Sequence, residues 1–176
     1  VASFALAPKP ELIARLKETG AVVIPSVGAA KHARKVAGWG ADAVIVQGGE
    51  GGGHTGPVAT TLLLPSVLDA VDIPVIAAGG FFDGRGLAAA LSYGAAGVAM
   101  GTRFLLTRES RVPDAIKQRY LDAAVTDTVV TTALDGAPQR VIRTETVDRL
   151  DRSSALTRLP RALRSALAFR KLTGTT

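Results

Sequence analysis

The sequence of 176 residues predicts an α/β fold, and within that class a carboxy-terminal portion of a TIM (β/α)8 barrel with about five βα units. Strand-like and helix-like segments alternate from Val1 to Gly101. The strand-like segments are apolar without alternation, which is typical of parallel strands covered on both faces. Glycine-rich stretches follow the third, fourth and fifth of these segments, where a barrel carries its functional loops.

Apolar runs and helical periodicity give the expected boundaries of the elements. The expected strands are Val1–Ala5, Ala21–Val27, Ala41–Gln47, Ile73–Gly79 and Ala96–Gly101. The expected helices are Glu11–Thr19, Ala29–Gly38, Thr61–Val71 and Arg85–Tyr93, with Arg111–Ala124 as a last helix. Gly20, Gly40 and Gly94 follow helical segments, where glycine commonly ends a helix.

The spacing of the elements alone does not separate a barrel from a doubly wound sheet. Two observations favour the barrel: the glycine-rich stretches follow several strands, and no GxGxxG fingerprint follows the first. Because a barrel needs eight strands, we expect three further strands, roughly a hundred residues, to precede Val1.

Composition bounds the class of protein. The sequence is 47% hydrophobic and lacks cysteine, so it offers neither disulfides nor thiolate chemistry. The longest apolar runs have strand length, and no segment approaches the about 20 residues of a membrane helix. Residues 1–7 lack the basic and apolar regions of a signal peptide, and we expect a cytoplasmic protein without a membrane span.

Positive charge is concentrated in the carboxy-terminal part of the chain. From Leu134 onwards there are nine Lys or Arg and four acidic residues, so this part carries +5 of the formal charge of +6. Such a tail can meet nucleic acid, an anionic membrane surface or a phosphorylated substrate, but a solvated helix face explains it more simply. No aromatic interleaving supports nucleic acid.

The change in composition suggests a boundary between a barrel portion at 1–125 and a carboxy-terminal extension at 126–176. The extension begins with a segment rich in Thr and Val that contains a turn at Asp135-Gly136. Leu156–Leu172 then has the pattern of a basic amphipathic helix interrupted by Pro160.

The most informative stretch runs from Gln47 to Gly56 and contains six glycines in ten residues. So little side-chain volume suits a backbone that lies against a flat ring or a phosphate. His54 and Glu50 are its titratable residues. We expect His54 to face the bound object, and Glu50 either orients His54 or caps the loop.

Two further strand ends have the composition of phosphate sites. Gly79-Gly80 precedes the helix that Asp83 and Arg85 open, and Ala99-Met100-Gly101-Thr102 follows the next strand. Glycine turns expose backbone N–H groups, and the Thr102 hydroxyl is a further donor. Two neighbouring strand ends of this kind are typical of a barrel phosphate site.

These residues match a family pattern. EGGGHTG, which contains His54, resembles the E-A-G-G-H-x-G signature of nitronate monooxygenases (formerly 2-nitropropane dioxygenases) and of flavin-type enoyl-acyl-carrier-protein reductases. DAVIVQ, PVIAAGGF and AMGT follow the same family pattern in the same order, and the resemblance runs from Val1 to about Arg143.

The resemblance implies FMN as cofactor, with His54 as the catalytic residue beside the flavin. We expect no metal site, because no cluster of His, Asp or Glu has the spacing of metal ligands. It implies cofactor-binding roles for one group of residues: Gln47, Gly52, Gly53, Gly79, Gly80, Ala99, Met100, Gly101 and Thr102. The segment from Gly136 to Thr144 resembles the one that folds back over the barrel in this family.

One departure affects the expected substrate. Many nitronate-oxidising members carry Arg after the histidine, whereas this sequence has Thr55, which removes a positive charge. We expect oxidation of alkyl nitronates with O2. The alternatives are an NAD(P)H-dependent flavin reductase acting on an unsaturated acyl-CoA or similar acyl thioester, and a non-catalytic FMN-binding or scaffold protein. The sequence is compatible with a homodimer.

Overall fold

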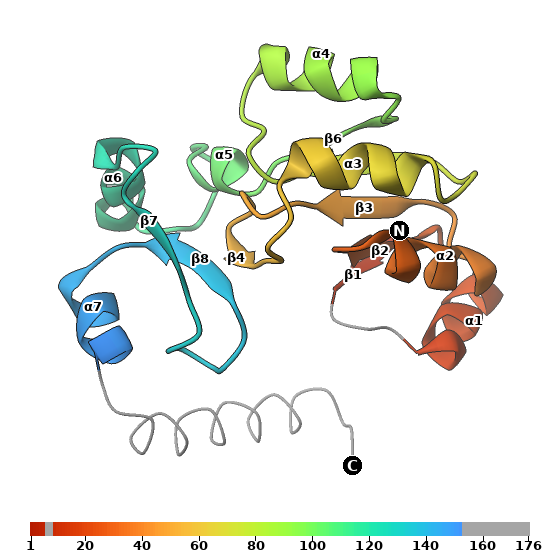
Figure 1. The fold of residues 1–176 in the computed structure, drawn as a ribbon, viewed down its shortest axis with the longest axis horizontal. Helices are drawn as coiled ribbons and strands as arrows, with labels where there is room; N and C mark the ends of the chain where they lie inside the picture. The colour runs from red at the N-terminus through yellow and green to blue at the C-terminus, as the bar shows by residue number, and fades with distance from the viewer. Residues whose placement is uncertain (6–8, 153–176) are drawn as a thin grey trace. The chain divides into compact units, whose positions relative to one another are not determined.

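The structure is a computed structural model that describes residues 1–5 and 9–152 (Figure 1). The chain forms two compact units. The first comprises Val1–Gly51 and Thr55–Ser110, and the second comprises Gly52–His54 with the chain from Arg111 onwards. The expected basic helix at Leu156–Leu172 lies outside the described residues.

The first unit contains a parallel sheet whose strands follow one another in chain order. Its strands are β1 (Ala2–Phe4), β2 (Val23–Val27), β3 (Val44–Gln47), β5 (Val75–Ala78) and β6 (Gly97–Ala99), in the order β1-β2-β3-β5-β6. A doubly wound sheet reverses direction at a switch point, whereas successive barrel strands add on one side only. The order therefore agrees with the expected portion of a barrel.

Helices connect these strands and pack beside them (Figure 1). They are α1 (Pro10–Glu18), α2 (Ala30–Gly38), α3 (Thr60–Leu68) and α4 (Gly84–Tyr93), followed by the short α5 (Thr102–Leu105). Gly20, Gly40 and Gly94 have φ angles of 75°, 95° and 101°. These positive angles confirm the expected glycine ends of three helices.

The core of the first unit lies between the sheet and its helices. Val44 and Val46 of β3 are fully buried, as are Ile13 of α1 and Val67 of α3. Burying such side chains contributes about 1.5–3 kcal/mol each. This packing holds the carboxyl ends of the strands in a fixed order.

The second unit is built on an antiparallel sheet of three strands. These are β4 (Gly53–His54), β8 (Gln139–Ile142) and β7 (Thr128–Thr131), in the order β4-β8-β7. The unit also contains α6 (Asp114–Asp122) and α7 (Glu145–Arg152). The expected Asp135-Gly136 turn lies between β7 and β8, with Gly136 at φ 94°.

Two features of the second unit differ from the sequence-based expectation. Gly53–His54 forms a strand although it lies in the glycine-rich loop, because it finds hydrogen-bonding partners on β8. The helix expected at Arg111–Ala124 is observed as α6, but α7, which follows it, was not expected from the sequence. The Thr144 hydroxyl accepts the Val147 N–H at 3.2 Å, and this helix-start signal could have revealed α7. Within the described ranges, no helix is long and apolar enough to cross a membrane.

Candidate active site

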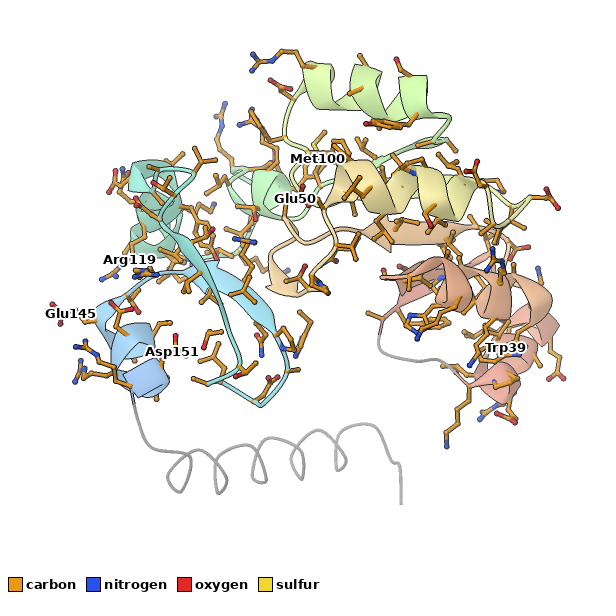
Figure 2. The ribbon with its side chains drawn as sticks, in the orientation of Figure 1. Trp39, Glu50, Met100, Arg119, Glu145 and Asp151 are labelled. Carbon is orange, nitrogen blue, oxygen red and sulfur yellow. The ribbon has the colours of Figure 1, made fainter. Side chains whose placement is uncertain are left out.

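Three neighbouring strand ends of the first unit carry most of the expected cofactor residues. Gln47 ends β3 and pairs in register with Ala78, and Ala78 pairs with Ala99 of β6. Gly79-Gly80 and Met100-Gly101-Thr102 therefore follow adjacent strands at the same edge of the sheet. Figure 2 labels Met100 at this edge and Glu50 in the loop that follows β3.

Three of the residues that we expect to bind the phosphate have backbone N–H groups available to a ligand. Within residues 1–5 and 9–152, no acceptor pairs with the N–H of Gly80, Gly101 or Thr102. All three residues are exposed, and a Cβ on Gly101 would meet no atom within 4 Å. Gly79 and Gly80 have φ angles of 96° and 83°, which favour glycine. This set of donors fits the phosphate of FMN.

The N-terminus of α4 does not contribute to this set of donors. The Asp83 Oδ1 accepts the N–H groups of Arg85 at 3.0 Å and Gly86 at 3.2 Å, so the helix is capped by its own residue. The Arg85 side chain and the Gly86 N–H lower the pKa of Asp83. The donors that remain near this strand end belong to the glycine turn.

Several glycines of the loop are explained by the protein's own atoms. A Cβ on Gly48 would lie 2.5 Å from the Cα and the N of Thr60, and a Cβ on Gly51 would lie 2.5 Å from Gln47 Nε2. Both glycines are buried. The density of glycine, which we interpreted as a sign of a bound molecule, thus partly reflects close packing of the loop.

Glu50 anchors the loop to the start of α3. Its Oε1 and Oε2 accept the Thr60 N–H at 3.3 and 3.0 Å, and the Thr60 hydroxyl lies 2.8 Å from Oε2. The Thr60 hydroxyl also lies 3.1 Å from the Gly79 carbonyl oxygen. Of the two roles considered for Glu50, these contacts support capping.

His54 belongs to the second unit, together with Gly52 and Gly53. Its Nε2 lies 2.8 Å from Oδ2 of Asp135, in the turn between β7 and β8. The imidazole is 42% exposed and the Asp135 side chain is 27% exposed. Sequence reasoning identified the turn at Asp135 but not this contact, because the two residues are 81 positions apart.

Partial burial raises the pKa of Asp135, but hydrogen bonds outweigh it. The Ala137 N–H, the Gln139 side chain and His54 together hold the pKa below its ordinary value of 3.8. Asp135 is therefore an ionised carboxylate at neutral pH. The pair gives an imidazole in contact with a fixed negative charge, an arrangement suited to proton transfer.

Comparison with known proteins shows the family of the chain. A family model described as nitronate monooxygenase matches residues 1–171. The chain belongs to the nitronate monooxygenase family. This confirms the resemblance found in the sequence and the expected α/β barrel class.

One curated relative is the (3aS,4S,5R,7aS)-5-hydroxy-7a-methyl-1-oxo-octahydro-1H-indene-4-carboxyl-CoA dehydrogenase of Mycobacterium tuberculosis. It is 75% identical over 175 residues, which are 98% of this chain and 49% of the relative. The chain thus spans about half the length of this curated relative.

Two solved structures have similar folds. FabK from Thermotoga maritima is 43% identical, with a TM-score of 0.84 over 93% of this chain and 51% of that one. Nitroalkane oxidase from Streptomyces ansochromogenes is 36% identical, with a TM-score of 0.77 over 86% of this chain and 48% of that one.

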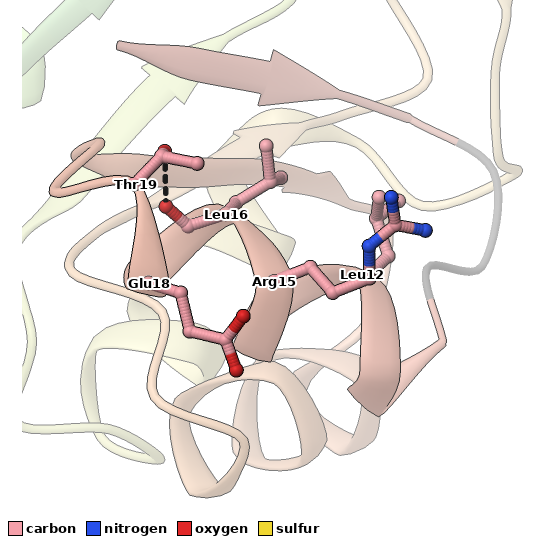
Figure 3. Close-up of a pocket in the computed structure, with 5 residues that line it drawn as sticks. All are labelled: Leu12, Arg15, Leu16, Glu18 and Thr19. Carbon is pink, nitrogen blue, oxygen red and sulfur yellow. Dashed lines mark hydrogen bonds between the residues drawn. The ribbon is translucent and has the colours of Figure 1, made fainter.

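A further hollow, of about 380 Å³, lies along α1 (Figure 3). Leu12, Arg15, Leu16, Glu18 and Thr19 line it. It contains none of the expected site residues, and the Thr19 hydroxyl within it donates to the Leu16 carbonyl of the same helix. We assign it no role in the site.

Proposed function

We propose that this chain supplies an FMN site and a proton-handling histidine to an oxidoreductase that acts on an acyl-CoA. The observation that carries this proposal is the 75% identity, over nearly the whole chain, to a dehydrogenase whose name specifies a hydroxylated bicyclic acyl-CoA. The expected alternative of an acyl thioester substrate is thereby favoured over an alkyl nitronate.

Gly80, Gly101 and Thr102 would hold the FMN phosphate through the donors that they leave open. Gln47, at the adjacent strand end, would contact the cofactor, as would Gly79, Ala99 and Met100 around the phosphate. For Gly52 and Gly53, which precede His54 in the second unit, the family pattern alone supports a cofactor-binding role. When bound, FMN supplies the redox chemistry by accepting or donating a hydride.

His54 would exchange a proton with the substrate. An imidazole gains or loses a proton near neutral pH, and a positioned acid or base contributes about 100- to 10,000-fold to a rate. In an oxidation of the alcohol, His54 would take the proton of the hydroxyl group while the carbon that bears this group gives up a hydride, for which bound FMN would be the acceptor. The reverse reaction would use the same groups in the opposite direction.

Thr55 supports a substrate whose reacting group is neutral. The Thr55 hydroxyl donates to the Gly48 carbonyl at 3.0 Å, so this residue closes the loop instead of presenting a cation beside His54. A cation there would favour an anionic nitronate electrostatically. An alcohol or ketone of an acyl-CoA gains no comparable benefit from it.

Nitronate oxidation with O2 is the second candidate. The name of the family model and the likeness to nitroalkane oxidase favour it. We propose separately that NAD(P)H is the reductant, and the stopped-flow experiment described next tests this as well.

Anaerobic stopped-flow measurements on the full-length, FMN-loaded protein distinguish the candidates. We expect a bicyclic hydroxyacyl-CoA to bleach the flavin absorbance. Bleaching by NADPH, followed by reoxidation with the corresponding keto or unsaturated acyl-CoA, would give the same substrate class in the reductive direction. Bleaching by propyl-2-nitronate with no response to any acyl-CoA would contradict the proposal and establish the second candidate.

A further inference from the structure

The residues around His54 restrict which of its two ring nitrogens can take part in proton transfer. β4 pairs with β8 in the register His54↔Gln139 and Gly53↔Arg140, so the backbone of His54 is fixed by the sheet. At this end of β8, the turn that leads into Gln139 brings the Asp135 carboxylate to 2.8 Å from Nε2. His54 is therefore held both at its backbone, by β8, and at its imidazole ring, by Asp135.

Asp135 is itself held independently of the histidine. Its Oδ1 accepts the Ala137 N–H at 3.0 Å, and the Gly136 N–H donates to the Thr132 carbonyl at 2.9 Å. Gly136 adopts φ 94°, which allows the turn to close. These contacts fix the Asp135 side chain with Oδ2 directed at the imidazole.

An ionised carboxylate can accept a hydrogen bond but cannot donate one. Asp135 is ionised at neutral pH, so the proton of the 2.8 Å contact must reside on Nε2 of His54. In the neutral imidazole only one nitrogen carries hydrogen, and the lone pair is then on Nδ1.

We propose that Asp135 is a positioning residue that holds His54 in its Nε2–H tautomer, which makes Nδ1 the atom that exchanges a proton with the substrate. This inference rests on the proposed function of His54 as a proton-handling residue. When Nδ1 takes a substrate proton, the imidazolium keeps its Nε2–H bond to Asp135, whose negative charge stabilises it. When the proton leaves Nδ1, the same neutral tautomer is restored.

Other charged groups of the second unit have different contacts. On β8, the Arg140 guanidinium donates to the Thr128 hydroxyl at 2.9 Å. On α7, the Asp151 carboxylate, labelled in Figure 2, accepts the Thr131 hydroxyl at 2.6 Å. Both groups remain in any Asp135 variant, so their electrostatic effects cancel when that variant is compared with the wild-type protein.

The test uses the full-length, FMN-loaded protein and three variants. Asp135→Asn keeps the size of the side chain but removes its charge, and its amide can donate to Nε2 and favour the other tautomer. Asp135→Glu keeps the charge. Asp127→Asn is the matched control, because Asp127 lies in the same hairpin and its Oδ2 accepts the Ala124 N–H instead.

For Asp135→Asn we expect unchanged FMN content and a loss of about 100- to 10,000-fold in the substrate half-reaction. The pH–rate profile should also change, because Asp135 no longer contributes its negative charge. ¹⁵N NMR of labelled histidine should show the proton leaving Nε2. Asp135→Glu should restore part of the rate and the pH profile, and Asp127→Asn should match the wild-type protein.

Two results would overturn the inference, and they differ from each other. If His54→Ala is impaired but Asp135→Asn keeps the wild-type rate, pH profile and tautomer, Asp135 does not position His54 although the proposed function stands. If His54→Ala itself retains the wild-type rate, the proposed function fails and the inference fails with it.

Discussion

Replacing Gly48 with alanine tests whether close packing explains the glycine-rich loop. The new Cβ would lie 2.1 Å from the Thr60 hydroxyl oxygen, which can rotate away, and 2.5 Å from the Thr60 Cα and N, which cannot. Since ordinary contacts begin at 3.4 Å, the start of α3 must retreat by about 0.9 Å. Such a movement also strains the bonds between Thr60 and Glu50.

Overpacking and the strained hydrogen bonds together determine how much Gly48→Ala should destabilise the protein. Overpacking costs about 1–3 kcal/mol, and a hydrogen bond to a charged group contributes about 1.5–3 kcal/mol. We therefore expect Gly48→Ala to lower the free energy of unfolding by about 3 kcal/mol, which corresponds to a fall in Tm of roughly 6–12 °C for a domain of 150–250 residues.

Gly28→Ala is the matched control, because a Cβ at Gly28 meets nothing within 4 Å and its φ is not positive. It should change the free energy of unfolding by less than about 0.5 kcal/mol. Thermal melting followed by circular dichroism measures both variants. If Gly48→Ala melts within 1 °C of Gly28→Ala, the packing explanation for this glycine is wrong.

Three further outcomes are expected. Gly101→Val should leave the Tm of the FMN-free protein unchanged, because its side chain has open space, yet abolish FMN retention; a purified variant with normal flavin stoichiometry by absorbance would refute the phosphate assignment. His54→Ala should retain FMN but lose about 100- to 10,000-fold in the substrate half-reaction measured by stopped flow. Because the folded-state pKa of Asp135 lies below 3.8, its stabilising contribution is present at neutral pH and lost as pH falls through that lower value. The difference in Tm between wild type and Asp135→Asn should therefore shrink between pH 7 and pH 3, and an unchanged difference would contradict this assignment of the charge.

The strands of the first unit could be predicted because their sequences are continuous apolar runs, although in the structure β2 and β3 alternate between buried and half-buried residues. Apolar runs such as Val44–Val46 mark a parallel sheet by composition alone, and the glycines at 20, 40 and 94 mark the ends of helices. The structure shortens the strands at their ends, since only the residues that pair with neighbours are counted in the sheet. The strand order then follows from short connections on one side.

The partner of the candidate catalytic residue could not be predicted. Gly53–His54 has no apolar pattern, and it becomes a strand only because β8 supplies hydrogen bonds. The carboxylate closest to His54 in sequence, Glu50, is bonded to Thr60, whereas Asp135 lies 81 positions away. Local composition carries no information about pairing over such a separation.

The pairing of β4 with β8 also has a consequence for the order of events during synthesis. Chains emerge from the ribosome from the amino terminus, and contacts between distant residues form late because their loop-closure entropy must first be overcome. The first sheet can pair once β6 has emerged, but His54 lacks its carboxylate and its strand partner until Asp135 and Gln139 have emerged. The histidine thus remains without its proton-directing partner while the first sheet assembles, and its pair with Asp135 forms only afterwards.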